Sequence, residues 1–320
     1  MNPNTNDRTT NNDPSTDGVD RRSFLKCMAW VGTGMVWTMK NGILTSQTFG
    51  APPPDATTDF TFVQISDSHI GFAKEPNKDV AATLKLAIDR INALATRPDL
   101  LIHTGDLTHL SKPEEFDTVD QLLKSAKVAE RFYVPGEHDV FADDAKAYLD
   151  RYGKNTRGLG WHSYTHRGVH FVGLVNVANL KPGGLGTLGR EQLDWLKKDL
   201  EPVGASTPIV VYAHVPLWTI YPKWGWGTQD SEAALALMKR FAAVTVLNGH
   251  IHQVMQKTEG NVTFHTARST AFPQPEPGQA ESPGPIKNVA AEKLRSTLGL
   301  AQVKYTETQH TLAVVDATLE

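Results

Sequence analysis

Side chains that commonly bind metal ions occur in five short segments of the chain. Each segment follows an apolar run that is typical of a β-strand. The segments are Asp67-Ser68-His69, Gly105-Asp106, Gly136-Glu137-His138-Asp139, the single His214, and Gly249-His250-Ile251-His252. A pair of divalent or trivalent cations requires carboxylate oxygens and imidazole nitrogens that converge from several loops. The pattern therefore predicts one site that holds two metal ions.

The elements that must position these segments alternate along the chain. The apolar runs before the segments predict strands at residues 60–65, 100–103, 132–134, 208–212 and 244–247. Helical spacing predicts helices at 80–95, from Pro113 onward, at 189–200 and at 231–241, and further strands are expected at 162–167, 169–176, 262–265 and 311–315. This alternation predicts an α/β fold with helices on the outside. In such folds ligands bind beyond the carboxyl ends of the strands.

Local backbone rules favour the same site. Asp67 and His69 are alternate residues, and alternate residues of a strand point to the same side, so both could face one ion. Gly136 and Gly249 permit sharp turns that bring the neighbouring side chains to the metals.

Composition narrows the class of protein. The chain has 320 residues, 40% hydrophobic content and a net charge of −3, which is ordinary for a globular enzyme with one sizeable core. No basic surface is indicated, so nucleic acid is not an expected partner. Cys27 is the only cysteine, so a chain cleaved after it would carry no disulfide and no thiolate ligand.

The first fifty residues are expected to lie outside the catalytic domain. Residues 1–20 are polar and predicted to be disordered. The run Arg21-Arg22-Ser23-Phe24-Leu25-Lys26 resembles a twin-arginine export signal, and the apolar stretch 27–39 is short for a membrane-spanning helix. We predict cleavage near Ala51, a linker at 51–58 and a catalytic domain at 59–320.

The resemblance to an export signal implies a location and a partner. The expected partner is the twin-arginine export machinery, and the expected location is the periplasm or the outside of the cell, without a stable membrane span in the mature form. Two alternatives remain open: an uncleaved signal anchor, or a basic pair beside a short amphipathic anchor.

The five segments together resemble the motifs of the calcineurin-like metallophosphoesterases. The resemblance covers residues 60–270, in the family's order, and points to the bacterial branch with cyclic-nucleotide phosphodiesterases and purple-acid-phosphatase relatives. It implies a four-layer sandwich of two mixed β-sheets flanked by α-helices. It also implies hydrolysis of phosphomonoesters or phosphodiesters by a hydroxide that two metal ions activate.

The resemblance implies a set of ligands for each metal ion. Asp67, His69 and His252 would bind one ion. His214 and His250 would bind the other, together with the residue at position 137.

The resemblance also implies roles for three side chains between or beside the ions. Asp106 would bridge the two metals. His138 would lie beside the metals without binding them and, as an imidazolium, would protonate the leaving oxygen or stabilise its charge. Asp139 would orient His138.

Position 137 departs from the family pattern. The usual residue is Asn, a neutral oxygen donor, and here it is Glu137. A third carboxylate lowers the positive charge of the site by one and weakens its attraction for an anionic phosphate. A trivalent iron would restore the balance, so an iron-containing pair is favoured, and Mn and Zn remain open. Alternatively, Glu137 turns away and water takes its place.

Other residues are weaker candidates for the substrate rim. Trp218, with the aromatic residues that follow it, either borders the substrate or packs locally. Arg268 either binds phosphate oxygens or is an ordinary surface arginine. His109 either supports a metal-binding side chain by a hydrogen bond or is simply solvated.

A second hypothesis for the whole protein is an exported metal-binding protein with little or no catalysis, which acts as a binding or sensor module. The replacement of the usual Asn by Glu137 is the main observation in its favour.

Overall fold

Residues 58–320 contain two β-sheets, and one of them carries the first three of the five motifs. In the computed structural model its strand order is β13-β12-β3-β4-β5, with β3 (Phe60–Ile65), β4 (Leu100–His103) and β5 (Glu130–Tyr133) parallel to one another. β12 (Gly299–Thr306) is antiparallel to β3 and pairs with β13 (Thr311–Thr318). The strands β3 and β4 are buried along their whole length, as their mainly apolar sequences lead one to expect.

The other sheet carries the last two motifs. Its order is β10-β11-β9-β8-β7-β6, and β7, β8, β9 and β11 are mutually parallel. β6 and β10 pair antiparallel at its two edges. The strands are β6 (His162–His166), β7 (Val169–Gly173), β8 (Ile209–Ala213), β9 (Val244–Asn248), β10 (Gln256–Glu259) and β11 (Val262–Thr266).

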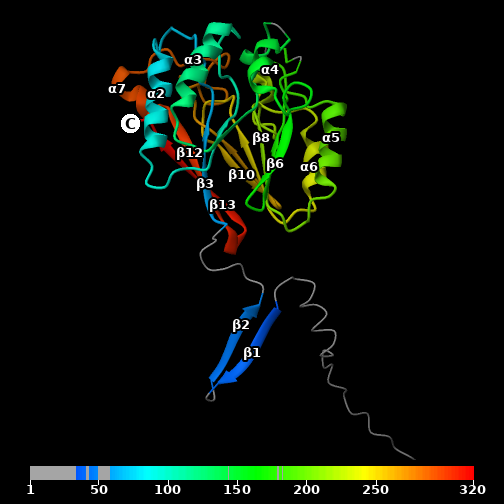
Figure 1. Ribbon diagram of the computed structural model, residues 1–320. Coiled ribbons are helices and arrows are strands. Elements are labelled where there is room, and N and C mark those ends of the chain that lie inside the picture. The colour runs from blue at the N-terminus through cyan, green and yellow to red at the C-terminus, as the bar shows by residue number, and fades with distance from the viewer. Residues whose placement is uncertain (1–33, 41–42, 50–57, 143, 179, 182) are drawn as a thin grey trace, which may run out of the picture. The chain divides into compact units, whose positions relative to one another are not determined.

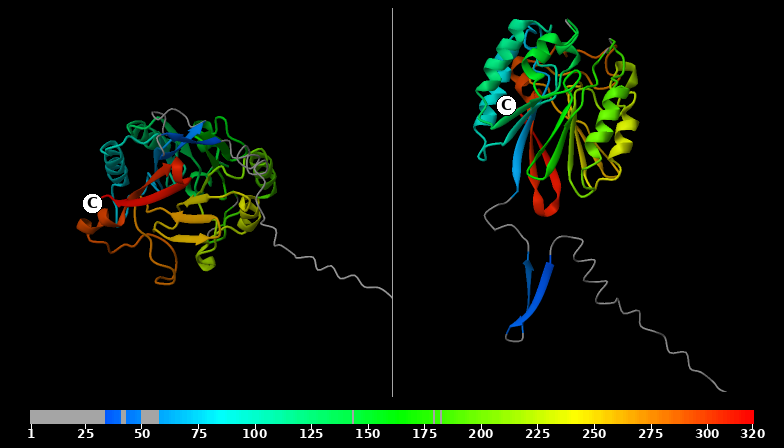
Figure 2. Two further views of the ribbon diagram at one scale, coloured as in Figure 1. Left: turned by 90° about the horizontal axis from the view of Figure 1, so that it is seen from below. Right: turned by 45° about the vertical axis from the view of Figure 1, so that its right-hand side comes forward.

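The two sheets face each other and helices cover their outer sides (Figure 1). The inner layer is apolar, with Phe62 and Ile102 from the first sheet and Phe171, Val210 and Leu247 from the second. One outer face packs α2, α3, α4 and α7, and the other packs α5 and α6. Figure 2 shows this layering from two further sides. The predicted four-layer α/β sandwich is confirmed.

The helices follow the expected apolar spacing. In α2 (Val80–Asn92) the buried residues include Val80, Leu84, Ile88 and Ile91, and Asp79 caps the first turn by accepting from Ala82 N. The other helices are α3 (Pro113–Lys124), α4 (Lys146–Tyr152), α5 (Arg190–Leu200), α6 (Ser231–Met238) and α7 (Ala291–Thr297). Short 3-10 turns occur at η1 (Glu137–Asp139), η2 (Pro222–Trp224) and η3 (Glu307–Gln309).

The structure describes residues 34–40, 43–49 and 58–320, except for 143, 179 and 182. The chain divides into two units after Thr57, and in the first unit β1 (Gly34–Lys40) pairs antiparallel with β2 (Ile43–Phe49). The predicted twin-arginine motif, the disorder of residues 1–20, the cleavage near Ala51 and most of the predicted linker lie outside the described residues. Within the described ranges, no helix has the length and apolar character needed to cross a membrane.

Candidate metal centre

The five motifs meet at one end of the sandwich, where strands of both sheets finish. Asp67, Asp106 and Glu137 lie in the loops after β3, β4 and β5 of the first sheet. His214 follows β8 and His250 follows β9 of the second sheet. The prediction that ligands lie beyond strand ends is therefore met by both sheets at once.

The side chains of five ligand residues are directed towards the site by backbone in the left-handed region, and not by the alternation of residues along a strand. β3 ends at Ile65, so Asp67 and His69 lie in a loop, with φ of 53° and 41°. Asp106, His250 and His252 also have positive φ, of 52°, 70° and 55°. Each such residue costs on the order of 1–3 kcal/mol, and such strain gathers at functional sites. Asp67 and His69 were expected to face one ion as alternate residues of a strand, and this expectation was wrong because both lie in a loop. Their side chains nevertheless lie together.

Gly136 and Gly249 provide room rather than unusual dihedral angles. Gly136 has φ −93° and ψ 179°, which any residue can adopt. A Cβ there would lie 2.0 Å from Asp106 Oδ1, and a Cβ at Gly249 would lie 2.7 Å from Asp67 Oδ2. The expectation of sharp turns at these two glycines is therefore corrected: their missing side chains let the motif loops approach the carboxylates.

The first ligand group consists of Asp67, His69 and His252. Their ligand atoms all lie within 4.8 Å of one another, and all three residues are buried. His252 Nδ1 donates to the carbonyl of Phe272 at 2.6 Å, which leaves Nε2 with its lone pair. That Nε2 lies 3.3 Å from Asp67 Oδ1 and 3.2 Å from His69 Nε2, an arrangement that suits a shared cation.

The second ligand group consists of Glu137, His214 and His250. Glu137 Oε2 lies 2.9 Å from His214 Nε2, and Glu137 Oε1 lies 3.0 Å from His250 Nδ1. The Oε2 and both ring nitrogens are buried, and none has a hydrogen-bond partner among the described residues. His214 Nδ1 donates to the carbonyl of Thr104 at 2.7 Å, so its Nε2 lone pair faces this group. Buried polar atoms without partners that converge on one point fit a cation.

Asp106 lies between the two groups. Its Oδ2 is 3.5 Å from His69 Nε2 and 3.4 Å from His214 Nε2, and its Oδ1 accepts from the backbone N of His138 at 2.9 Å. Burial alone would lower the pKa of His214, but Asp106 and Glu137 outweigh it and hold that pKa well above its ordinary value. The negative charge of these carboxylates raises the pKa of His214, and a pair of bound cations would neutralise the same charge.

His138 is held beside the carboxylates by a backbone carbonyl. Its Nδ1 donates to His109 O at 2.7 Å, and its ring stacks on the His109 ring at 4.9 Å. Burial acts to lower the pKa of His138, but Asp106, Glu137 and this carbonyl outweigh it and raise the pKa above its usual value. The residue therefore favours the imidazolium form that protonates a leaving oxygen.

Asp139 has a different role from the one expected. Its carboxylate accepts from Gly136 N at 2.9 Å, Leu107 N at 3.1 Å, and both the N and Oγ1 of Thr108 at 2.8 Å. Burial and the nearby Asp106 raise the pKa of Asp139 to about 7. Asp139 ties the loop after β4 to the loop after β5, whereas the group that orients the His138 ring is the carbonyl of His109.

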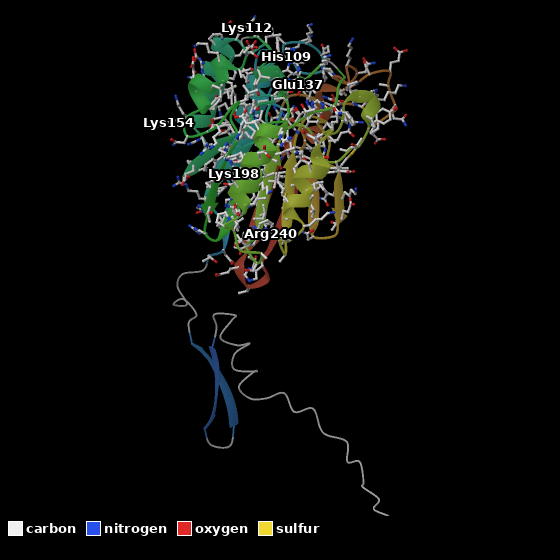
Figure 3. All side chains as sticks on the ribbon, turned by 90° about the vertical axis from the view of Figure 1, so that its right-hand side faces the viewer. His109, Lys112, Glu137, Lys154, Lys198 and Arg240 are labelled. Carbon is white, nitrogen blue, oxygen red and sulfur yellow. The ribbon has the colours of Figure 1, made fainter. Side chains whose placement is uncertain are left out.

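His109 adjoins a metal-binding side chain. Its Nδ1 is 3.4 Å from His69 Nδ1, so His69, whose Nε2 faces the first ligand group, donates its other ring hydrogen there. Burial lowers the pKa of His109 to about 4, which keeps it neutral and able to accept. Glu115 fixes the loop by accepting from His109 N at 3.2 Å and Leu110 N at 2.8 Å. His109 and Glu137 lie at the same end of the second unit (Figure 3) and line one cavity.

A cavity of about 1090 Å³ opens over the ligand groups. Trp224 and Trp226 line it, but Trp218 does not, because its ring packs on Phe264 at 5.0 Å on the outer side of the second sheet. Arg268 is also absent from the described lining, and its Nη1 donates towards Thr297 O. The structure thus places neither Trp218 nor Arg268 where the substrate rim was predicted.

Sequence reasoning missed part of the cavity wall. Phe72 and Phe272 flank His109 and His69 on one side, and Phe141, 59% exposed, lies 6.1 Å from the His138 ring. Phe141 follows the third motif by two residues, and that proximity was the only available signal. Phe272 lies twenty residues after His252, so only the fold brings it here.

Comparison with known proteins agrees with this geometry. A 3',5'-cyclic-nucleotide phosphodiesterase of Nostoc sp. is 27% identical over 219 residues, which span 66% of this chain and 79% of that protein. A probable glycerophosphodiester phosphodiesterase of Arcobacter nitrofigilis is 29% identical over 223 residues, spanning 65% of this chain and 77% of that protein.

Solved structures share the fold. A purple acid phosphatase from yellow lupin superimposes with a TM-score of 0.61 at 13% identity, covering 87% of this chain and 55% of that one. A dimetal phosphatase from Danio rerio gives a TM-score of 0.55 at 14% identity, covering 82% and 99%.

The sequence profile of the calcineurin-like phosphoesterases matches residues 60–254, from β3 to just beyond His252. This range contains both ligand groups, Asp106 and His138. The chain therefore belongs to the calcineurin-like phosphoesterase family, the metal-dependent hydrolases of phosphate esters.

Proposed function

We propose that this protein hydrolyses phosphodiesters at the centre formed by its two ligand groups. The single observation that carries the proposal is that two three-residue groups, each able to hold a cation, share Asp106 between them. When bound, two cations supply an activated water nucleophile and neutralise the charge that develops on the phosphate. Relatives named as phosphodiesterases favour the diester over the monoester.

The chain's own side chains divide the remaining tasks. Asp67, His69 and His252 would hold one ion, and Glu137, His214 and His250 would hold the other. Asp106, which lies between the two groups, would contact both ions.

His138 acts on the substrate. It lines the cavity beside Asp106, and its Nδ1 is already committed to a carbonyl. The other ring nitrogen is the one that gives a proton to the departing oxygen. His109, through its carbonyl, holds this ring in place.

The identity of the ions and the place of action are proposals as well. Carboxylate and imidazole ligands suit Fe, Mn and Zn, and the three carboxylates favour a pair that includes trivalent iron. The twin-arginine motif at positions 21–22 supports export in the folded state, with the metals already bound, to the periplasm or beyond.

Metal analysis and a panel of phosphate esters test the proposal together. Protein purified with two metal equivalents per chain should hydrolyse aryl phosphodiesters, and Asp106→Asn should abolish turnover together with at least one bound ion. Lys154→Ala alters an exposed residue that is not part of the cavity lining and should match the parent. A doubly loaded protein that hydrolyses no ester would instead support the metal-binding module without catalysis.

A further inference from the structure

We propose that Glu137 shifts the selectivity of this centre towards phosphate esters that carry one negative charge and away from those that carry two. This inference rests on the proposed function and names the substrate class of the same site. It concerns a residue that differs from the usual Asn of the family.

The geometry places the charge of Glu137 inside the centre. Its two carboxylate oxygens face His214 and His250 at 2.9 and 3.0 Å, and the side chain is 28% exposed. Glu137 also lines the cavity that the substrate must enter. The possibility that Glu137 turns away from the second ligand group is not the arrangement in the structure.

The charge of the centre follows from its side chains. Asp67, Asp106 and Glu137 contribute three negative charges, where an Asn at position 137 would leave two. For the same pair of cations the centre is therefore one unit less positive. A phosphodiester carries one negative charge near neutral pH, while a monoester carries close to two, because its second pKa is about 6.

A dianion feels the extra carboxylate twice as strongly as a monoanion. The discrimination is one charge–charge interaction across about 5 Å, which at an effective dielectric constant near 20 amounts to on the order of 10²-fold in relative affinity. Because the comparison is between Glu and a neutral residue at one position, the discrimination is the same for divalent ions and for a pair with trivalent iron.

Other charged residues of the cavity do not cancel this effect. Lys74, Lys181 and Lys287 line the cavity, as do Glu75 and Asp144, and all five are exposed. Exposed charges are screened by water and salt, so they change the rate at which any anion arrives more than the choice between anions. Glu137 acts at the atoms that bind the phosphate.

Glu137→Gln and Glu137→Asn test the inference by removing the charge while they retain an oxygen donor. The matched control is Glu75→Gln, which removes a carboxylate from the same cavity; Glu75 is exposed and pairs with Lys78 at 2.7 Å. For each protein the ratio of kcat/KM for bis(p-nitrophenyl) phosphate to that for p-nitrophenyl phosphate is measured. Metal content is measured on the same samples, and proteins are compared at equal occupancy.

A second readout does not depend on turnover. Calorimetry compares a phosphonate pair that contains no ester bond and so cannot be hydrolysed: methylphosphonate at a pH where it is a dianion, and its monoanionic analogue dimethylphosphinate. Both Glu137 variants should favour the dianion by on the order of 10²-fold more than the parent does, and the ester ratio should fall by a similar factor. Glu75→Gln should change neither ratio.

The outcomes separate the inference from the function on which it rests. Unchanged ester ratios and unchanged phosphonate preference in metal-loaded Glu137 variants would overturn the inference while hydrolysis stands. An equal change in Glu75→Gln would also overturn it, because the effect would then belong to the whole cavity. Absence of turnover in the parent would contradict the proposed function, and the phosphonate pair would still decide the role of Glu137.

Discussion

The imidazole of His138 is oriented by the backbone carbonyl of His109, at 2.7 Å, and not by the neighbouring carboxylate of Asp139. A carbonyl cannot titrate, so it holds the ring as a donor at every pH. The proton on Nδ1 is fixed by this bond, and the other nitrogen is left for the substrate. The general acid therefore depends on the position of the loop that carries His109.

Replacing His138 should slow the departure of poor leaving groups most. His138→Ala should lower kcat about 10²–10⁴-fold for alkyl esters, because these need a proton on the departing oxygen. Esters of p-nitrophenol, whose leaving group is stable as an anion, should lose much less. Rates for a series of leaving groups measure this dependence. An equal loss for all esters would show that His138 serves binding and not protonation.

Asp139 should matter for stability more than for chemistry. Asp139→Ala leaves three buried backbone N–H groups without an acceptor, and each costs about 1–3 kcal/mol. The free energy of unfolding should therefore fall by at least about 3 kcal/mol, as measured by urea denaturation. Asp89→Ala removes only an exposed pair with Lys85 and should cost about 0.5 kcal/mol or less. Comparable losses in both variants would contradict the role of Asp139 as a tie between loops.

A single methyl group at position 136 should disrupt the centre. In Gly136→Ala the new Cβ would meet Asp106 Oδ1 at 2.0 Å, so the carboxylate between the ligand groups must move. Metal content and turnover should both fall. Gly204→Ala is the control, because its Cβ would meet only Thr207 Oγ1, at 3.6 Å. Full metal content in Gly136→Ala would show that the loop can shift without loss of the site.

His103 should make the metal-free protein less stable in acid. Burial lowers the pKa of His103 to about 3, while in the unfolded chain it is near 6.5. Between these values the unfolded state binds a proton that the folded state does not, so stability falls as pH falls from 6.5 to 3. The full difference is roughly 5 kcal/mol. Above pH 6.5 the residue has no effect.

Denaturation curves of His103→Gln and the parent across this pH range measure the contribution. His103 Nε2 donates to Ser68 Oγ at 2.8 Å, and Gln retains a donor there. The parent should lose stability more steeply on acidification than the variant does. Parallel curves would mean that His103 already titrates normally in the folded protein.

Much of the fold could be predicted because its central strands are mainly apolar. The strands β3, β8 and β9 stand directly before their motifs, and burial on both faces allows little polar sequence. α4 was missed because it has only seven residues and begins after Ala145, whose φ is 65°. β12 was missed although it pairs with β3, because its partner lies more than 230 residues earlier in the chain.

The metal ligands could be predicted because the order of the motifs along the chain identifies them. The residues that line the cavity could not, because their positions depend on how the loops pack. Which tryptophan of the segment after β8 reaches the cavity depends on the loop path, so Trp226 lines it while Trp218 packs behind the sheet. The left-handed backbone at Asp67 and His69 has only a weak signature in the residue types, since Asp and His adopt it more often than most residues but far less often than Gly. The carbonyl that holds His138 is backbone, and every residue possesses one.

Each ligand group takes side chains from both halves of the sandwich: His252 joins Asp67 and His69 across it, and Glu137 joins His214 and His250. Each bound ion would consequently cross-link the two sheets at the end of the sandwich where the motifs lie. The two sheets can separate only if both ions are released. Protein with bound metal should therefore resist thermal and mechanical unfolding better than metal-free protein does. Neither of these two ligand groups is complete in one half alone.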